Sequence, residues 1–431
     1  MRQQRDERRG FAKVLRTMDA GSRPALRPVE SIVVPDKQHG RVLVLRDMQG
    51  VTDAHAVVPP VLVPVVGRFN GAQTCEEIAR SASEEIGITV PVEIVVRLAE
   101  ELERGLFLDA GPFRAALARI EREFAQATVR PASHAGAAYH SERRALESYI
   151  ERGCIAKANG GGARPSNGSK MVALVAPHID PWRGAVTYGH AYGALLAALP
   201  SDADTFVLLG TSHAPMRQPF ALCRKAFATP LGTVEADLAA IDALAARAHE
   251  FDPFADQINH KREHSLEFQV VFLKHLLKDR PVRIVPILVG LGSQQASGED
   301  PGQNTSITRF LDGVRELVEA RPGRVIVVAG ADLAHIGPRF GDESALGTEE
   351  RERLERADRA SIERATCLDA GGFWDHVAGD IEERRICGLA PIWSLLRTVS
   401  SDVLGRLLHY EQTVDPEDGS IVSHAAVGFY G

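Results

Sequence analysis

Four continuous apolar runs mark the carboxyl-terminal part of the chain. They are MVALVA (171–176), TFVLLG (205–210), VRIVPILVG (282–290) and RVIVVAG (324–330). Uninterrupted apolar runs of this length are typical of strands that are covered on both faces. Apolar residues at helical spacing separate the runs and predict helices over 184–199, 234–249, 265–277 and 307–320. The alternation predicts an α/β fold with a largely parallel sheet flanked by helices.

The end of the chain adds two further apolar segments. GRLLHYEQTVD (405–415) and SIVSHAAVGFY (420–430) predict a closing pair of strands. The α/β domain is therefore expected to span residues 171–431.

A second, smaller domain is predicted over residues 28–110. RVLVLRD (41–47) predicts a strand, and VPPVLVPVVGRFNG (58–71) predicts an apolar, partly helical segment. Thr74 and Glu77 have the spacing of a capping box at a helix start. A second helix is expected from Pro91 to Gly105, followed by LFLDA (106–110) as a strand or wing. This order predicts a winged-helix-like module, which can bind either DNA or a peptide.

The remaining segments read as connections. Residues 1–27 are charged, lack the apolar core of a secretory signal and predict a disordered basic arm. Residues 111–170 predict a helical connector that ends in the linker KANGGGARPSNGSK (157–170). The glycine, serine and proline of this linker cannot form a core, so we expect the domain boundary there.

Charge and cysteine content narrow the class of protein. The net charge is −7 and the pI is about 6.1, which argues against nucleic acid as a partner. The helix at 91–105 carries four acidic residues, which favours a peptide over DNA for the small module. The sequence contains no run of about 18 apolar residues, so it predicts no membrane-spanning segment. The five cysteines are scattered without a C-x-x-C, which fits a reducing cytoplasm and excludes a cysteine-based structural zinc site.

Polar residues follow three of the predicted strands. His178 follows the run at 171–176, His213 follows the run at 205–210, and Asp332 and His335 follow the run at 324–330. Ligands of parallel sheets gather at the carboxyl ends of strands. Imidazole is the commonest metal ligand near neutral pH, so we expect a metal site at this edge.

Two further segments contain candidate residues for this site. Cys387 precedes a predicted helix start, where a thiol pKa is lowered and the thiolate is favoured. Glu263 and His264 stand at another helix start and are candidates for the same site. Glu267, one turn further, is expected to be a solvated helix charge.

Eight motifs in order make the domain from about 171 to 431 resemble the Memo family, in particular the bacterial and archaeal proteins called AmmeMemoRadiSam system protein B. They are APHIDPWRG, LLGTSHAP, ATPLGTVEAD, REHSLEFQVVFL, VPILVG, GADLAHIG, ICGLAPI and VSHAAVGF. The resemblance implies a fold like that of class III extradiol dioxygenases, in which two histidines and a carboxylate hold a mononuclear iron. It further implies that His178, His213 and Cys387 are metal ligands, with Asp332 and His335 lining the pocket. FNGAQTCEEIA and VVRLAEELERGLFLD make the small module similar to the PqqD-like peptide-recognition fold.

Two hypotheses follow for the function. The first is a dioxygenase-like redox enzyme that binds iron or copper, with zinc as a further candidate. Its catalytic groups would be His335, Asp332, His264 and Glu263. The second is a non-catalytic metal- or peptide-binding adaptor on a dioxygenase-derived fold. In either case the small module predicts a peptide or protein partner, with a radical-SAM protein as the candidate, and neither nucleic acid nor membrane.

Overall fold

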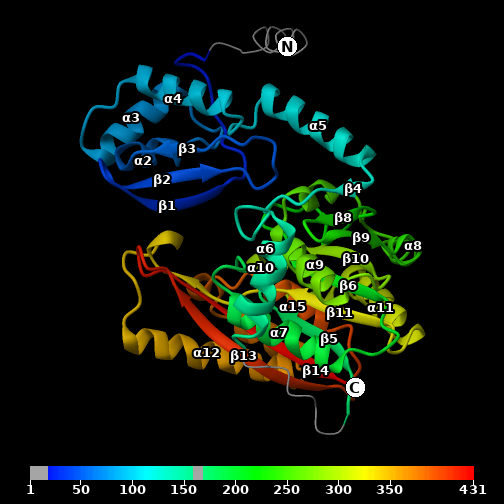
Figure 1. Ribbon diagram of the computed structural model, residues 1–431. Coiled ribbons are helices and arrows are strands. Elements are labelled where there is room, and N and C mark those ends of the chain that lie inside the picture. The colour runs from blue at the N-terminus through cyan, green and yellow to red at the C-terminus, as the bar shows by residue number, and fades with distance from the viewer. Residues whose placement is uncertain (1–17, 159–167) are drawn as a thin grey trace. The chain divides into compact units, whose positions relative to one another are not determined.

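The computed structural model describes residues 18–158 and 168–431 (Figure 1). The chain divides into two compact units, Met1–Gln126 and Ala127–Gly431. The predicted basic arm as far as residue 17, and residues 159–167 of the predicted linker, lie outside the described residues. Among the described residues, no helix combines the length and apolarity needed to cross a bilayer.

The amino-terminal unit pairs a small sheet with a set of helices. The antiparallel sheet has the order β1-β2-β3. Its elements are β1 (Glu30–Asp36), β2 (Gly40–Arg46), β3 (Ala56–Val58), η1 (Pro60–Leu62), α2 (Val63–Val66), α3 (Cys75–Ile86), α4 (Val92–Arg104) and α5 (Gly111–Gln126). The capping box of Thr74 and Glu77 is confirmed at the start of α3. Helix α4 runs from the cap at Pro91 to Gly105, as predicted.

Two features of this unit differ from the prediction. Residues 18–27 are ordered, because the buried guanidinium of Arg27 pairs with Asp47 at 3.0 Å and Leu26 bridges to Leu108. The sheet also precedes the helices, and Leu108 contributes a single bridge in place of a wing strand. The winged-helix and PqqD-like interpretations therefore remain predictions.

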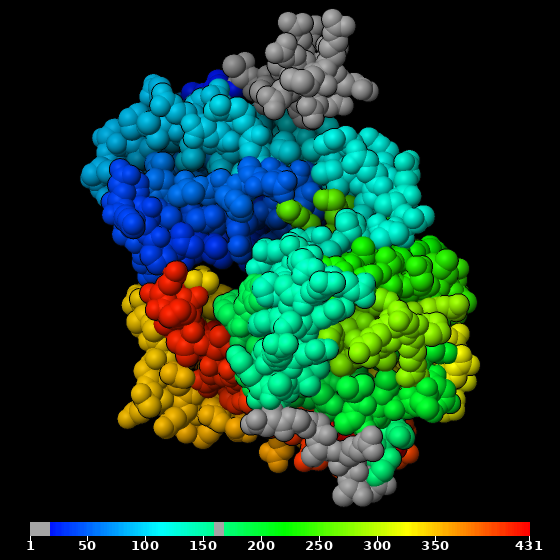
Figure 2. Space-filling model, viewed as in Figure 1, coloured from blue at the N-terminus to red at the C-terminus, as the bar shows by residue number. Residues whose placement is uncertain are grey.

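The predicted connector over 111–170 is divided between the two units. Helix α5 belongs to the amino-terminal unit, whereas residues 127–158 belong to the carboxyl-terminal unit. There β4 (Val129–Arg130) pairs with β8 (Ala226–Thr229), and α6 (Arg143–Ser148) continues into the π-helix η2 (Tyr149–Ile155). Figure 2 shows this turquoise segment lying on the green surface of its own unit. It packs there because it carries buried polar side chains whose partners lie on the α/β core, as described below.

The carboxyl-terminal unit has a sheet with a parallel centre, which confirms the predicted fold class. The strand order is β12-β14-β5-β11-β6-β10-β9-β8-β4, with β13 beside β14 and β7 beside β10. The neighbours β5, β11, β6 and β10 all run parallel. The strands are β5 (Met171–Ala176), β6 (Thr205–Thr211), β7 (Phe220–Leu222), β9 (Gly232–Ala236), β10 (Arg283–Val289), β11 (Val325–Gly330), β12 (His335–Ile336), β13 (Leu404–Val414) and β14 (Ile421–Tyr430). The last two form the predicted closing pair and extend the sheet antiparallel to β5.

Helices cover both faces of this sheet (Figure 1). On one face lie α7 (Ala185–Ala198) and α9 (His264–Leu277). The other elements are α8 (Leu238–Ala245), η3 (Gln257–Lys261), α10 (Gly292–Ser297), η4 (Pro301–Gln303), α11 (Thr305–Ala320), η5 (Pro338–Phe340), α12 (Thr348–Thr366), α13 (Ala370–Ala378), α14 (Ile381–Arg384) and α15 (Leu389–Leu396). Helices α8, α11, α13 and α15 bury a large apolar cluster that includes the T-shaped pair Trp374 and Trp393. Continuous burial of the central strands explains their unbroken apolar runs.

One helix prediction is wrong in part. The segment 234–249, expected to be a single helix, begins as strand β9 and becomes helix α8 only at Leu238. Asp237 causes the change, since its carboxylate accepts a hydrogen bond from the backbone N–H of Ala240 and caps the helix. Strand β9, which pairs with both β8 and β10, therefore precedes a short helix.

Candidate metal centre

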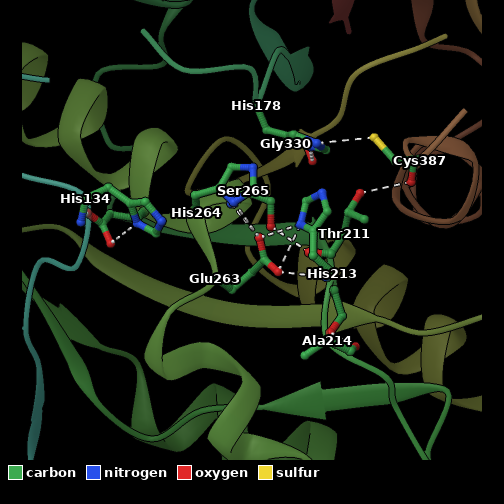
Figure 3. A network of polar contacts seen from close by, with 12 residues as sticks. His134, His178, Thr211, His213, Ala214, Glu263, His264, Ser265, Gly330 and Cys387 are labelled. Carbon is green, nitrogen blue, oxygen red and sulfur yellow. Dashed lines mark hydrogen bonds and ion pairs between the residues drawn. The ribbon is translucent and has the colours of Figure 1, made fainter. Parts of the chain in front are cut away.

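Three adjacent strand ends bring the candidate ligands together. Strand β11 lies between β5 and β6, and all three run parallel, so their carboxyl ends share one edge. His178 follows β5, Asp332 follows β11 and His213 follows β6. Cys387 reaches the same edge from the residue before the cap of α15 (Figure 3).

His178, His213 and Cys387 form a compact donor set. One nitrogen of each imidazole and the thiol sulfur all lie within 4.8 Å of one another. The sulfur is 3.2 Å from Nε2 of His178. The two imidazole rings are 5.2 Å apart and nearly perpendicular. Two nitrogens and a sulfur at these separations can all contact one ion, because metal–nitrogen and metal–sulfur bonds are about 2.0–2.3 Å long.

Both imidazoles are held through Nδ1, which leaves Nε2 for the centre of the set. Nδ1 of His178 lies 3.0 Å from the carbonyl oxygen of Gly330. A carbonyl oxygen only accepts, so Nδ1 donates its proton there. Nδ1 of His213 faces the carboxylate of Glu263 at 3.0 Å. Such carboxylate and carbonyl partners fix the tautomer and the ring orientation of metal-binding histidines.

The charges at the site favour a thiolate. Burial raises the pKa of Cys387, but His178 and His335 outweigh it and lower the value to about 5. Burial by itself would lower the pKa of His178, yet Cys387 and Asp332 raise it to about 9. At neutral pH the sulfur is therefore a thiolate whose partner proton sits on imidazole. A metal cation can replace that proton, because thiolate and imidazole bind metals in their deprotonated forms.

Close approach of α9 to the strand ends places Glu263 beside His213. A Cβ at Gly330 would lie 2.3 Å from the carbonyl oxygen of Ser265, and one at Gly210 would lie 2.5 Å from its hydroxyl. Only glycine at both strand ends lets the helix start sit this near the sheet. Glu263 caps α9 through the N–H of Ser265 and accepts the backbone N–H of His213 at 2.8 Å. Burial would raise the pKa of Glu263, but His213 holds it well below its usual value.

Asp332 and His335 occupy neighbouring but different positions. Asp332 is buried, accepts the backbone N–H of His178 at 2.8 Å and lies 3.7 Å from its Nε2. His335 begins β12, and its Nδ1 is 3.1 Å from the carbonyl oxygen of Leu333. His335 lies outside the compact donor set but is near enough for its charge to affect the thiol of Cys387.

A row of imidazoles leads away from the donor set. The ring of His264 stacks on His213 at 4.5 Å, and the ring of His134 lies 5.5 Å beyond it (Figure 3). Burial and the neighbouring His213 hold the pKa of His264 well below its usual value, so this ring is neutral at neutral pH. His134 comes from the segment read as a connector, and sequence reasoning missed it. The prediction of a helical connector over 111–170 gave no reason to single out this histidine.

Glu267 is buried and anchors this segment, so the prediction of a solvated charge is wrong. Its carboxylate pairs with Arg130, and both side chains are almost fully buried. It also accepts hydrogen bonds from the hydroxyls of Ser133 and Tyr139 and from the backbone N–H of His134. Burial would raise the pKa of Glu267, but Arg130 and His134 lower it well below its usual value.

The same segment is held at a second place by the loop after His178. The indole N–H of Trp182 donates to the carbonyl oxygen of Ala137 at 2.9 Å. Its ring lies edge-on to His140 at 4.6 Å and to Tyr149 at 4.7 Å. The residues after β5 therefore have two roles. His178 points into the donor set, and Trp182 holds the segment that contains Ala137 and His140.

A cleft of about 680 Å³ reaches the donor set. His213 and Cys387 line it, together with apolar groups such as Met216, Phe251 and Leu291. Its volume is typical of pockets that hold small molecules. Part of the donor set is therefore open to a ligand from outside.

Comparison with known proteins agrees with this architecture. Residues 130–428 match the family model described as Memo-like protein. A MEMO1 family protein of Aquifex aeolicus is 25% identical over 394 residues, which cover 91% of this chain and 97% of that protein. A MEMO1 family protein of Thermus thermophilus is 28% identical over 292 residues, 68% of this chain and 80% of the relative. One from Thermococcus kodakarensis is 28% identical over 275 residues, 61% of this chain and 88% of the relative.

The matched region begins at residue 130, which is where β4 joins the sheet. The segment with Arg130 and His134 is thus part of the family domain and not a connector. The chain belongs to the Memo-like protein family.

Proposed function

We propose that this Memo-like domain binds one redox-active metal ion, iron or copper, through His178, His213 and Cys387. The observation that carries the proposal is the donor set itself, in which two imidazoles anchored at Nδ1 direct Nε2 toward a thiolate. Imidazole nitrogen and thiolate suit iron, copper and zinc and disfavour magnesium or calcium. Zinc therefore remains a further candidate.

The function we favour is that of a dioxygenase-like oxidoreductase. A metal held by three protein ligands keeps open positions at which O₂ or an oxygen-donor substrate can be activated. The cleft of about 680 Å³ supports this, since it gives a small molecule access to His213 and Cys387. A purely structural metal site would be closed by a fourth protein ligand.

The surrounding residues have separate tasks in this proposal. Glu263 holds the ring of His213, and Asp332 holds the backbone of His178, so both ligands keep their orientation without substrate. His264 is neutral and lies against His213, where its ring can form a hydrogen bond with a bound substrate. His335 donates Nδ1–H to Leu333, which leaves its Nε2 as a second acceptor for protons.

The experiment is metal analysis of the purified chain followed by activity screening. The wild type should hold about one iron or copper per chain, and His178→Ala combined with Cys387→Ser should abolish it. Oxygen uptake with a panel of catechols then tests turnover. Stoichiometric metal without oxygen uptake would favour the alternative, a non-catalytic metal- or peptide-binding adaptor.

The amino-terminal unit is proposed to recruit a peptide or protein, with a radical-SAM protein as the candidate. Helix α4 supports a peptide ligand over nucleic acid, because Glu93 and Glu101 are exposed on it while Glu103 is buried. Acidic side chains repel phosphates and attract basic peptides. Crosslinking of the full chain in cell extract, with the amino-terminal unit deleted as the control, tests for such a partner.

A further inference from the structure

His134 carries an imidazole of which the fold uses only one nitrogen. The segment that bears it is already anchored by the carboxylate of Glu267. This carboxylate accepts hydrogen bonds from the guanidinium of Arg130, from the backbone N–H and the hydroxyl of Ser133, and from the backbone N–H of His134. The hydroxyl of Tyr139 adds a further hydrogen bond to the same carboxylate. The ring of His134 contributes only its Nδ1 contacts to this cluster, and these contacts leave its Nε2 unused.

The hydrogen bonds of His134 decide which nitrogen is free. Nδ1 lies 3.2 Å from Oε2 of Glu267 and 3.0 Å from the hydroxyl oxygen of Ser133. That hydroxyl donates to Glu267, so both neighbours present acceptor oxygens to Nδ1. Nδ1 therefore carries the proton, and the neutral ring keeps a lone pair at Nε2. No described residue pairs with this nitrogen.

This free nitrogen belongs to a ring that is open to solvent beside the metal ligands. The side chains of His134, His264 and His213 are 27%, 23% and 24% exposed, respectively. The rings follow one another at 4.5 and 5.5 Å, and Figure 3 shows them in a row. His264 and His134 do not line the cleft of about 680 Å³, so a small molecule that reaches His134 from the metal lies along the exposed sides of these two rings.

We propose that His134 is a positioning residue, whose Nε2 accepts a hydrogen bond from the end of the substrate remote from the metal. This inference rests on the proposed metal site. It assigns the substrate to a chemical class: a small molecule with an oxygen donor for the metal at one end and an O–H or N–H donor at the other. The family domain thus obtains part of its specificity from residues 130–139, the segment that precedes its first central strand.

The test uses the full chain loaded with Co²⁺ and two probes that differ in one donor. 4-Hydroxybenzohydroxamate and 4-methoxybenzohydroxamate both chelate metals through oxygen, but only the former has a remote O–H. Their dissociation constants are read from the visible bands of bound Co²⁺. 4-Hydroxyphenylacetohydroxamate and its methoxy analogue repeat the comparison at a greater length.

The wild type should bind the hydroxy member of at least one pair roughly two- to tenfold more tightly, the effect of one neutral hydrogen bond. His134→Phe and His134→Ala should abolish this preference and leave binding of the methoxy probe and of Co²⁺ unchanged. His140→Phe is the matched control, because His140 lies on the same segment but packs on Trp182 away from the row. It should keep the preference.

Three results would overturn the assignment. The first is equal binding of both members of each pair by the wild type. The second is a preference for the hydroxy probe that survives in the His134 variants. The third is loss of the Co²⁺ bands in both His134 variants, which would make the residue structural. Failure of the proposed function looks different. In that case the wild type gives no thiolate-to-cobalt band, or a band that no hydroxamate changes.

Discussion

The buried pair of Arg130 and Glu267 should control how firmly the outer segment is attached. The substitution Glu267→Gln removes a charge that faces a guanidinium in the protein interior. The amide oxygen can keep the hydrogen bonds from Tyr139 and from the backbone N–H of His134. The amide nitrogen then faces the donors of Arg130, Ser133 and His134 that Oε2 accepts in the wild type. Removing one partner of a buried ion pair costs about 3–5 kcal/mol. We expect the free energy of local opening of residues 127–158 to fall by about this amount.

Hydrogen–deuterium exchange measures this opening segment by segment. Peptides that cover 130–139 should exchange faster by a factor on the order of a hundred or more in Glu267→Gln, whereas peptides from β6 and β11 should change little. Glu319→Gln is the control, since its carboxylate is exposed and lies 3.9 Å from Arg315. Loss of a surface pair costs at most about 1 kcal/mol. Equal exchange of 130–139 in the two variants would show that the pair of Arg130 and Glu267 does not hold this segment.

The pH dependence of the same pair has a defined sign. The pKa of Glu267 is lowered in the folded chain, so its contribution to stability is complete above the unfolded pKa of about 4.3 and is lost as pH falls through the folded value. The difference between wild type and Glu267→Gln should therefore be constant from pH 6 to 7 and shrink in strong acid. A difference that grows on acidification would contradict this assignment.

Three other predictions concern the metal site and the two units. Glu263→Gln should weaken metal binding roughly 10- to 100-fold in a chelator competition assay, because the substitution loosens the ring of His213. Unchanged metal affinity would show that the carboxylate does not orient this ligand. Proteases should cut first within 157–170. The two fragments should then co-elute in size-exclusion chromatography, because residues 127–158 pack on the α/β core, and separation of the fragments would contradict that packing. The amino-terminal unit should give no nanomolar, sequence-specific DNA binding at physiological salt in a fluorescence anisotropy assay, and such binding would exclude the peptide interpretation.

Local patterns in the sequence predicted the parts of the fold that depend on local physics. The strands around His178 and His213 were readable because burial on both faces demands unbroken apolar runs. The capping box at Thr74 and the limits of α4 were readable because helix ends need specific side chains. The meeting of His178 with His213 followed from parallel strands sharing one edge.

The rest depended on contacts between distant residues. Glu267 looked like a surface charge because Arg130, its partner, is 137 residues away in the sequence. His134 was missed for the same reason, since Glu267 fixes both its backbone and its ring. The strand at 232–236 was hidden because its apolar residues also fit a helix, and pairing with β8 decided the outcome.

X-ray absorption spectroscopy of the iron-loaded chain identifies the atoms bound to the metal. We expect one sulfur neighbour at about 2.3 Å and two imidazole nitrogens at about 2.0–2.2 Å from the metal. Cys387→Ser should remove the sulfur contribution, and the spectrum of Cys223→Ser should match that of the wild type, because Cys223 is buried outside the donor set. A metal surrounded only by oxygen and nitrogen in the wild type, or a sulfur signal that persists in Cys387→Ser, would show that Cys387 is not a metal ligand.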